Sequence, residues 1–181
     1  MNNPVSFSYV VGQNGQVNGQ FALNQQSITF KMEKSANPLH EMLTGMMELV
    51  AEPRYYWGMP NTCKIDWYDE SESLRWILST QDGQQLDVLL YKCANMFEEP
   101  SDELIISGTC SLINFYQAIL EKADLVIKEN GLLGYGHQQR QGDFPIASFL
   151  FLKKFLINQG KWFANNQVQK EFEEEINLLL S

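Results

Sequence analysis

The chain has 181 residues, 44% of them hydrophobic and 19% charged, so extensive disorder is disfavoured and a single domain over residues 1–181 is expected. The 13 Lys and Arg residues against 22 Asp and Glu residues give a net charge of −9. This charge repels phosphate backbones and acidic bilayers, so we expect no nucleic-acid partner and no membrane partner.

Strand patterns occupy the N-terminal part of the chain. Val5, Phe7 and Tyr9 lie at every second position, which is the period of two expected of a half-buried strand. The GQNG turn follows, and two further short strands are predicted at 17–23 and 27–33.

The next element is predicted to be a helix. Asn37 and Pro38 suit the N-cap and the first helical position, and Pro53 ends the pattern. An apolar stripe at helical spacing follows, which we interpret as core rather than as a methionine-rich binding groove. The stripe comprises Leu39, Met42, Leu43, Met46, Met47 and Val50. His40 is expected on the exposed face.

A second group of strands is predicted in TCKIDWY, SLRWILST and QLDVLLYKC, with the QDG turn marking a hairpin. A short apolar run from Leu104 to Ile106 leads into SGTCS, where Ser107 or Thr109 can cap a long helix over 111–130. Gly131 is a natural stop for that helix.

The C-terminal part is predicted to contain a connector and two helices. GYGHQQRQGDFP, residues 134–145, is the connector, and Pro145 begins a helix that is apolar on nearly every side over 146–157 and should be central to the core. A last helix over 166–180 is expected to bury five apolar residues, Val168, Phe172, Ile176, Leu179 and Leu180. The fold class is therefore α+β, with one antiparallel sheet of about six or seven strands packed against three or four helices.

The sequence contains few groups suited to catalysis. Cys63, Cys93 and Cys110 are odd in number and widely spaced, which argues against a disulfide framework or a zinc ribbon and fits a reducing compartment. Cys110 lies near a predicted helix start, where the helix dipole favours a thiolate. We nevertheless interpret Cys110 as a small, buried apolar side chain. His40 and His137 have no ligands at metal-binding spacing, so no metal and no cofactor are expected.

The targeting signals are also few. MNNPVSFSYVV lacks the basic region of a signal peptide, and the apolar run at 144–157 is too short to span a bilayer. We therefore expect a cytoplasmic protein.

The 134–145 segment is the first candidate binding feature. Its glycines follow a helix rather than a strand, unlike a dinucleotide or phosphate loop. It is interpreted as a connector or a binding edge, with Tyr135, His137 and Arg140 as candidate partner-binding residues.

Two acidic clusters are the second feature. The first comprises Asp66, Asp69, Glu70 and Glu72, and the second comprises Glu98, Glu99, Asp102 and Glu103. Clustered carboxylates can bind magnesium or act on glycosides, but a solvated face is the usual reading and a docking surface the next. Six aromatic residues surround the first cluster and provide either protein-binding anchors or sheet core. They are Tyr55, Tyr56, Trp57, Trp67, Tyr68 and Trp76, of which Trp67 is included among the candidate contacts.

SLINFYQAILEKADLVIKENGLLGY followed by FPIASFLFLKKFL resembles the C-terminal half of small bacterial proteins of the polymorphic-toxin immunity type. The similarity covers about residues 111–156, with a fainter match in SITFKMEKSANPLHEMLTGMMEL. It implies a cytoplasmic inhibitor of a cognate toxin and identifies no functional residues.

The leading functional hypothesis is a non-catalytic protein-binding protein that docks a basic partner through an acidic, aromatic surface. Two alternatives remain open: an enzyme that uses Cys110 or the clustered carboxylates, and a structural subunit of a larger complex. The charge is also compatible with a role in solubility alone.

Overall fold

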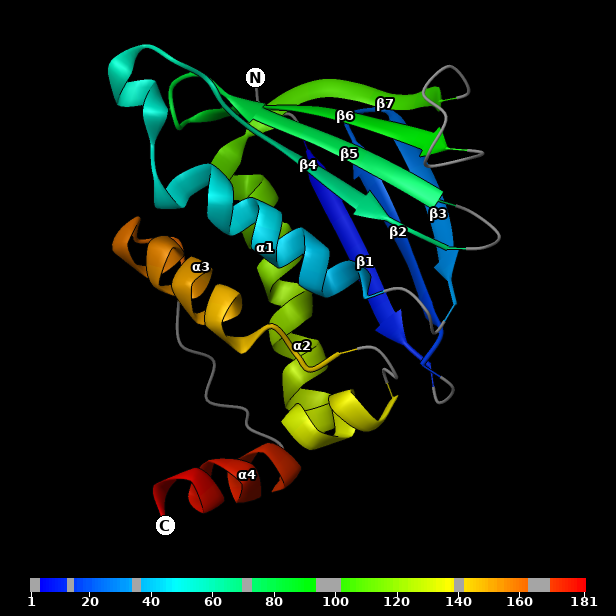
Figure 1. Cartoon of the computed structure of the whole chain (residues 1–181), viewed down its shortest axis with the longest axis vertical. Coiled ribbons are helices and arrows are strands. Elements are labelled where there is room, and N and C mark those ends of the chain that lie inside the picture. Colours follow the sequence, from blue (N-terminus) through cyan, green and yellow to red (C-terminus); the bar gives the residue numbers. More distant parts are fainter. Residues whose placement is uncertain are drawn as a thin grey trace.

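A computed structural model describes residues 4–12, 15–33, 37–69, 73–93, 102–138, 142–162 and 170–181. Three strands come first: β1 (Val5–Val11), β2 (Val17–Leu23) and β3 (Gln26–Met32). Helix α1 (Pro38–Ala51) and the 3-10 helix η1 (Arg54–Trp57) follow. Then come β4 (Asn61–Trp67), β5 (Ser73–Thr80), β6 (Gln85–Cys93) and β7 (Asp102–Ser111). Three helices complete the chain, α2 (Leu112–Gln138), α3 (Ile146–Asn158) and α4 (Lys170–Leu180) (Figure 1).

The fold is α+β, as predicted, but its seven strands form two antiparallel sheets rather than one. One sheet has the order β1-β2-β3 and the other the order β4-β5-β6-β7. Because α1 and η1 separate β3 from β4 in the chain, these two strands are not joined by a hairpin. The sheets meet through side chains instead: the Glu33 N–H donates to the Asp69 carboxylate, and the Gln26 side-chain amide hydrogen-bonds the backbone of Ser107.

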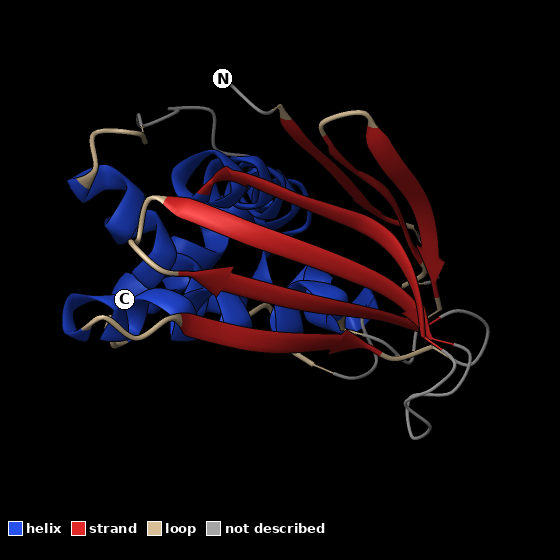
Figure 2. Cartoon of the chain, turned by 90° about the horizontal axis from the view of Figure 1, so that it is seen from above, coloured by secondary structure: helices blue, strands red, loops and turns tan. Residues whose placement is uncertain are grey.

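The helices cover the inner faces of the sheets. Helix α1 packs on β4 and α2 packs on β1, and Figure 2 shows the helices gathered on one side of the four-stranded sheet. Gly45 allows α1 to approach β4 closely, because a Cβ at this position would lie 2.5 Å from Cγ1 of Ile65. The core between these layers is aromatic: the Trp76 ring lies 4.8 Å from the Phe21 ring and 5.0 Å from the Trp67 ring, centroid to centroid.

Helix α1 agrees with its prediction in its start, and the predicted stripe is buried except for Met47, which is partly buried. The Asn37 side chain accepts a hydrogen bond from the His40 N–H, and Pro38 is the first helical residue. His40 is exposed, as expected. The long helix starts within one residue of its predicted position, but its cap differs, because β7 pairs with β6 as far as Ser111. The capping oxygen is therefore that of Ser111, which accepts from Asn114 N–H at 3.4 Å, and neither Ser107 nor Thr109 is a cap.

Helix α2 breaks at Gly131, which has φ 67° and ψ 175°. The stop at this glycine was predicted, but the chain resumes a helical path up to Gln138, so residues 134–138 are not a loop. The Glu175 carboxylate of α4 accepts hydrogen bonds from the N–H groups of Leu132 at 2.5 Å and Leu133 at 2.9 Å. A side chain from a distant helix thus caps the second segment, which no local pattern could indicate.

Two predictions about the C-terminal helices are wrong. Helix α3 is not central, since it buries one side only, at Ser148, Phe149, Leu152 and Leu156. Leu150, Phe151 and Ile157 on its other side are exposed. In α4 the predicted core residues Ile176, Leu179 and Leu180 are also exposed, because this helix packs on α2 at one end of the molecule (Figure 1). Val168 lies outside the described residues.

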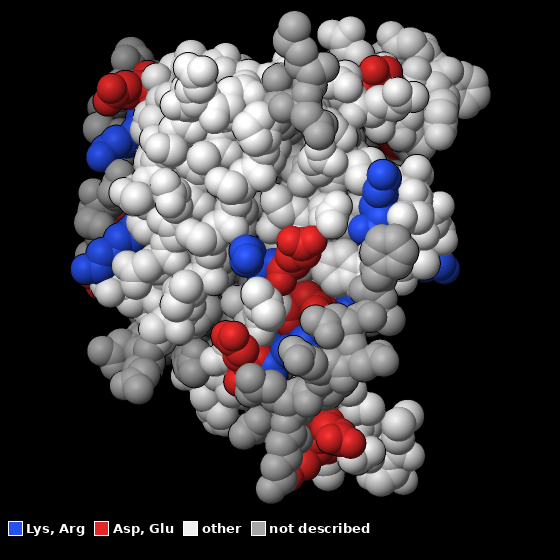
Figure 3. Space-filling model, turned by 180° about the vertical axis from the view of Figure 1, so that it is seen from behind, with Lys and Arg blue, Asp and Glu red and all other residues white. Residues whose placement is uncertain are grey.

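The charges are not spread evenly over the surface. On the rear face, Lys and Arg side chains lie next to Asp and Glu side chains, and a broad area carries neither (Figure 3). Between α2 and α3, the Asp124 carboxylate is mostly buried and pairs with Nζ of Lys128 and of Lys153, both at 2.6 Å. Asp124 is therefore engaged within the protein and is not a free acidic group on the surface.

Candidate functional site

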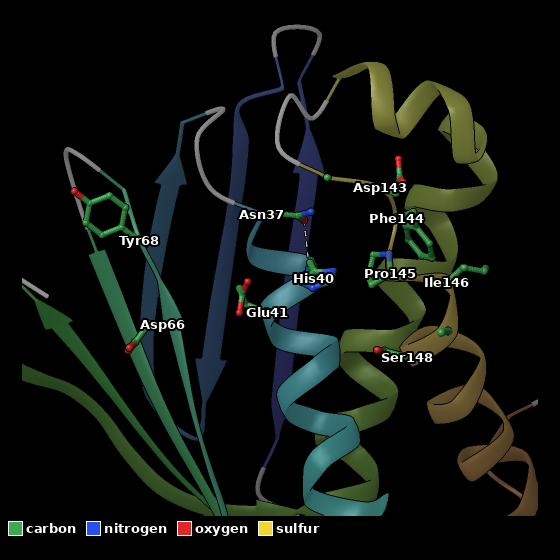
Figure 4. A pocket seen from close by; sticks show the side chains of 12 residues that line it. Asn37, His40, Glu41, Asp66, Tyr68, Asp143, Phe144, Pro145, Ile146 and Ser148 are labelled. Atoms are coloured by element: carbon green, nitrogen blue, oxygen red, sulfur yellow. Dashed lines mark hydrogen bonds between the residues drawn. The ribbon is translucent and has the colours of Figure 1, made fainter.

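An open groove of about 720 Å³ lies where the start of α1, the end of β4 and the start of α3 meet. Its lining comes from three parts of the chain that are distant in sequence. These residues are Asn37, His40, Glu41, Asp66 and Tyr68, and then Gly142, Asp143, Phe144, Pro145, Ile146, Ala147 and Ser148. Figure 4 shows His40 and Glu41 on α1, with Asp143 and Pro145 on one side of them and Asp66 on β4 and Tyr68 just after β4 on the other side. The structure thus brings residues 142–145 of the connector and Asp66 of the first acidic cluster together at a helix start.

Asn37 holds these segments in place. Its Oδ1 accepts from the His40 N–H at 3.3 Å and from the Tyr135 hydroxyl at 2.9 Å. Its Nδ2 lies so near the backbone of Gly142 that a Cβ there would be 2.8 Å away. One cap side chain therefore positions α1, the end of α2 and the start of the 142–145 segment.

Tyr135 is a structural residue and not a partner contact, which corrects the prediction. Its side chain is fully buried and stacks edge-on against Phe144, with ring centroids 5.5 Å apart. Burial raises the pKa of its hydroxyl far above the ordinary value, so Tyr135 stays protonated and acts as a hydrogen-bond donor. His137 is exposed near the end of the same helix, and Arg140 lies outside the described residues.

The charged side chains in the groove are predominantly acidic. Three of the lining residues, Glu41, Asp66 and Asp143, carry carboxylates, and the lining residues include neither Lys nor Arg in the part of the chain described. Asp66 is partly compensated, by Nε of Arg75 at 2.8 Å and Nζ of Lys64 at 3.6 Å. Among ion pairs between described residues, none involves Glu41 or Asp143.

The rest of the first acidic cluster has a different role from the one predicted. Asp69 is buried, where its carboxylate accepts from Glu33 N–H and its backbone carbonyl accepts from Ser73 Oγ at 2.9 Å. Trp67 is only 1% exposed and belongs to the core together with Trp76. Trp67 therefore fails as a docking residue, because a strand alternates its side chains between two faces and that of Trp67 falls on the inner one. Asp69 follows β4 and fails because it is buried. Glu70 and Glu72 lie outside the described residues.

The second acidic cluster is also partly structural. Asp102 pairs with Nη1 of Arg75 at 2.7 Å, and both side chains are largely buried on the outer face of the four-stranded sheet. Arg75 joins Asp102 to Asp66, and its pKa is raised first by the hydrogen bond to Asp66. Because the Asp102 side chain is largely buried and paired with Arg75, it offers little exposed charge to a basic partner. Glu103 is exposed, while Glu98 and Glu99 lie outside the described residues.

The thiols are unsuited to nucleophilic chemistry. Burial, followed by the nearby charge of Asp87, raises the pKa of Cys110 to about 12. Burial likewise raises the pKa of Cys63 to about 12 and that of Cys93 to about 11. Thiols with these pKa values remain protonated near neutral pH, whereas a nucleophile needs a thiolate. The prediction that Cys110 is a buried small side chain is confirmed.

The described residues contain no group of three or more His, Cys, Asp or Glu side chains placed to hold a metal ion. Within the same residues, every helix is too short or too polar to cross a bilayer. Comparisons with known protein families, with curated proteins and with solved structures gave no match.

Sequence reasoning missed several residues of the groove. Asn37 was assigned only as a helix cap, and Glu41 and Asp143 were given no binding role. The local sequence does not distinguish Glu41, because an acidic residue in a first helical turn is ordinary. Their common feature is spatial: each borders the same concave surface.

Proposed function

We propose that the protein is a non-catalytic binding protein that receives a basic segment of a partner protein in the groove between α1, β4 and residues 142–148. The observation that supports this most is the concave, acid-lined surface, which has Tyr68 on its rim with 52% of its area exposed. Carboxylates beside an exposed aromatic ring suit the charge and the aliphatic stem of a Lys or Arg side chain.

The enzyme alternative has less support. Cys110 is buried and protonated, and Asp69 and Asp102 are engaged by groups of the protein itself. In the groove, the Asp66 carboxylate is held by Arg75. The similarity of residues 111–156 to immunity-type proteins suggests that the basic partner is a toxin, and this part of the proposal rests on that similarity alone.

A structural subunit is the second candidate function, favoured by the exposed apolar side chains of α3 and α4. Leu150 and Phe151 on α3, and Leu178 to Leu180 on α4, are surfaces that a larger assembly could cover. Native mass spectrometry of the complex isolated from its own cells distinguishes the two: a stoichiometric complex that buries α3 and α4 favours the subunit.

The groove is tested with blocked peptides of equal length that contain either lysine or glutamine at alternate positions. Fluorescence anisotropy is measured at about 0.05 M and about 0.5 M salt, because screening weakens exposed charges. We expect the lysine peptide to bind at low salt and to lose about threefold to tenfold in affinity with the pair Glu41→Gln and Asp143→Asn. The control pair, Glu129→Gln and Glu173→Gln, removes the same charge from exposed positions on α2 and α4 and should leave binding unchanged. Equal losses with both pairs would mean that only net charge matters and would refute a groove-specific function.

A further inference from the structure

Strand β4 has an open edge that borders the acidic groove. In the part of the chain described, β4 pairs with β5 alone, so the backbone groups on its other edge face no strand. Such an edge can pair with an extended segment of another chain. Its seven residues give a ladder long enough for specific recognition.

Helix α1 runs beside this edge and presents a row of carboxylates to it. Glu41, Glu48 and Glu52 are all exposed and are spaced at i, i+7 and i+11. Glu41 and Glu48 lie within α1, and at 3.6 residues per turn they fall within about 20° of one line. Glu52 directly follows the last helical residue, so the row is about 17 Å long. Gly45 brings α1 against Ile65 in the middle of β4, so the row flanks the strand rather than pointing away from it.

The two ends of the edge coincide with two cavities. At the end of β4, the groove already described contains Glu41 together with Asp66. At the start of β4, a second cavity of about 350 Å³ contains Glu48 and Glu52 together with Thr62. Each cavity is bordered by both α1 and β4, so together they mark the two ends of one surface along the open edge of β4, the edge surface. Exposed aromatic side chains lie toward its ends: Trp57, 81% exposed, follows α1, and Tyr68 follows β4.

Among the described residues, the cations along this edge surface are Arg54 and Lys64, together with the ionisable ring of His40. Arg54 borders the second cavity, and Lys64 lies with Asp66 on the outer face of β4, with 3.6 Å between Nζ and Oδ2. On the α1 side the row of three glutamates therefore exceeds the single arginine. An incoming strand would find acidic residues on one face and mixed charges on the other.

We propose that the basic partner binds by adding a strand to the open edge of β4, with Lys or Arg at alternate positions directed toward the α1 row. This inference rests on the proposed function for the basic character of the partner, and adds the mode of recognition. Alternate side chains of a strand are about 6.8 Å apart, so three of them span about 14 Å, which flexible basic side chains extend to the 17 Å of the row. A second copy of this chain is a poorer occupant, because pairing β4 with itself would bring two glutamate rows and two charges of −9 together.

The test uses a blocked seven-residue peptide of alternating lysine and threonine, and two forms of it that are N-methylated on all lysines or on all threonines. In a strand at a sheet edge, every second residue directs its N–H toward the neighbouring strand. Strand addition therefore predicts that one methylated form loses about tenfold or more in affinity, while the other stays within about threefold of the parent. Hydrogen exchange should slow at β4 amides on binding of the parent peptide.

Two matched variants test the row. The pair Glu48→Gln and Glu52→Gln should weaken the parent peptide about threefold to tenfold at low salt, whereas the pair Glu129→Gln and Glu173→Gln should not. If both methylated forms bind like the parent, or if both lose the same amount of affinity, strand addition is wrong while the proposed function stands. If the parent peptide fails to bind as well, the proposed function fails with it. A concentration-dependent dimer in sedimentation velocity that the peptide dissociates would assign the edge to a second copy and overturn the inference.

Discussion

The side chain of Asn37 is the clearest single point at which to perturb the site. It accepts hydrogen bonds from the His40 N–H at 3.3 Å and from the buried Tyr135 hydroxyl at 2.9 Å. Replacing it with alanine removes a helix cap and leaves a buried hydroxyl without its acceptor.

The expected loss is worked from these two contacts. A lost N-cap costs about 1 kcal/mol, and a buried donor left unsatisfied costs about 1–3 kcal/mol. The neighbouring Tyr9 hydroxyl, whose pKa is raised by burial and by Tyr135, offers a substitute partner, so the lower half of the range is expected. Asn37→Ala should therefore lower the free energy of unfolding by about 2–3 kcal/mol. Asn37→Asp keeps the acceptor oxygen and should cost less than about 1 kcal/mol, because a carboxylate is favourable at a helix start.

The assay is urea unfolding followed by tryptophan fluorescence, since Trp67 and Trp76 lie in the core. Tyr135→Phe provides the second arm of a double-mutant cycle, because in that background Asn37→Ala loses only the cap. The cycle should give a coupling free energy of about 1 kcal/mol. Additive effects within about 0.3 kcal/mol would show that Asn37 and Tyr135 do not interact, and the account of how the groove is positioned would be wrong.

Three further predictions concern stability and the thiols. Gly131→Ala should destabilise by more than about 1 kcal/mol in thermal unfolding, because φ is positive and a Cβ would lie 2.6 Å from the Glu175 carboxylate; a stabilised variant would contradict the break in α2. Asp124→Ala leaves Lys128 and Lys153 without their carboxylate and should cost about 3 kcal/mol, whereas a loss below about 1 kcal/mol would show that the pair is solvated. The pKa of Cys110 is raised by folding to about 12 from 9.0, so the folded state favours the protonated thiol: this contribution to stability is complete below pH 9.0 and is lost as pH rises toward 12. Between neutral pH and pH 12, the free energy of unfolding should fall more in the wild type than in Cys110→Ser. Equal falls in the two proteins would count against the buried thiol.

The sequence alone determined the local elements. Alternation in residues 5–9 and the Asn37–Pro38 pair indicated β1 and the start of α1, because side-chain period and capping chemistry act within a few residues. The buried stripe of α1 and the break at Gly131 follow from the same local rules.

Only the tertiary structure decided how those elements combine. A pattern shows which face of an element is apolar but not which surface covers it, so two sheets could not be distinguished from one and α3 could not be placed at the periphery. The same limit applies to the site. Asp69 and Asp66 are close in sequence and equal in charge, yet Asp69 is buried and Asp66 lines a groove. The difference arises because Asp69, beyond the end of β4, meets the backbone of Glu33, which is distant in sequence and is brought near only by the fold.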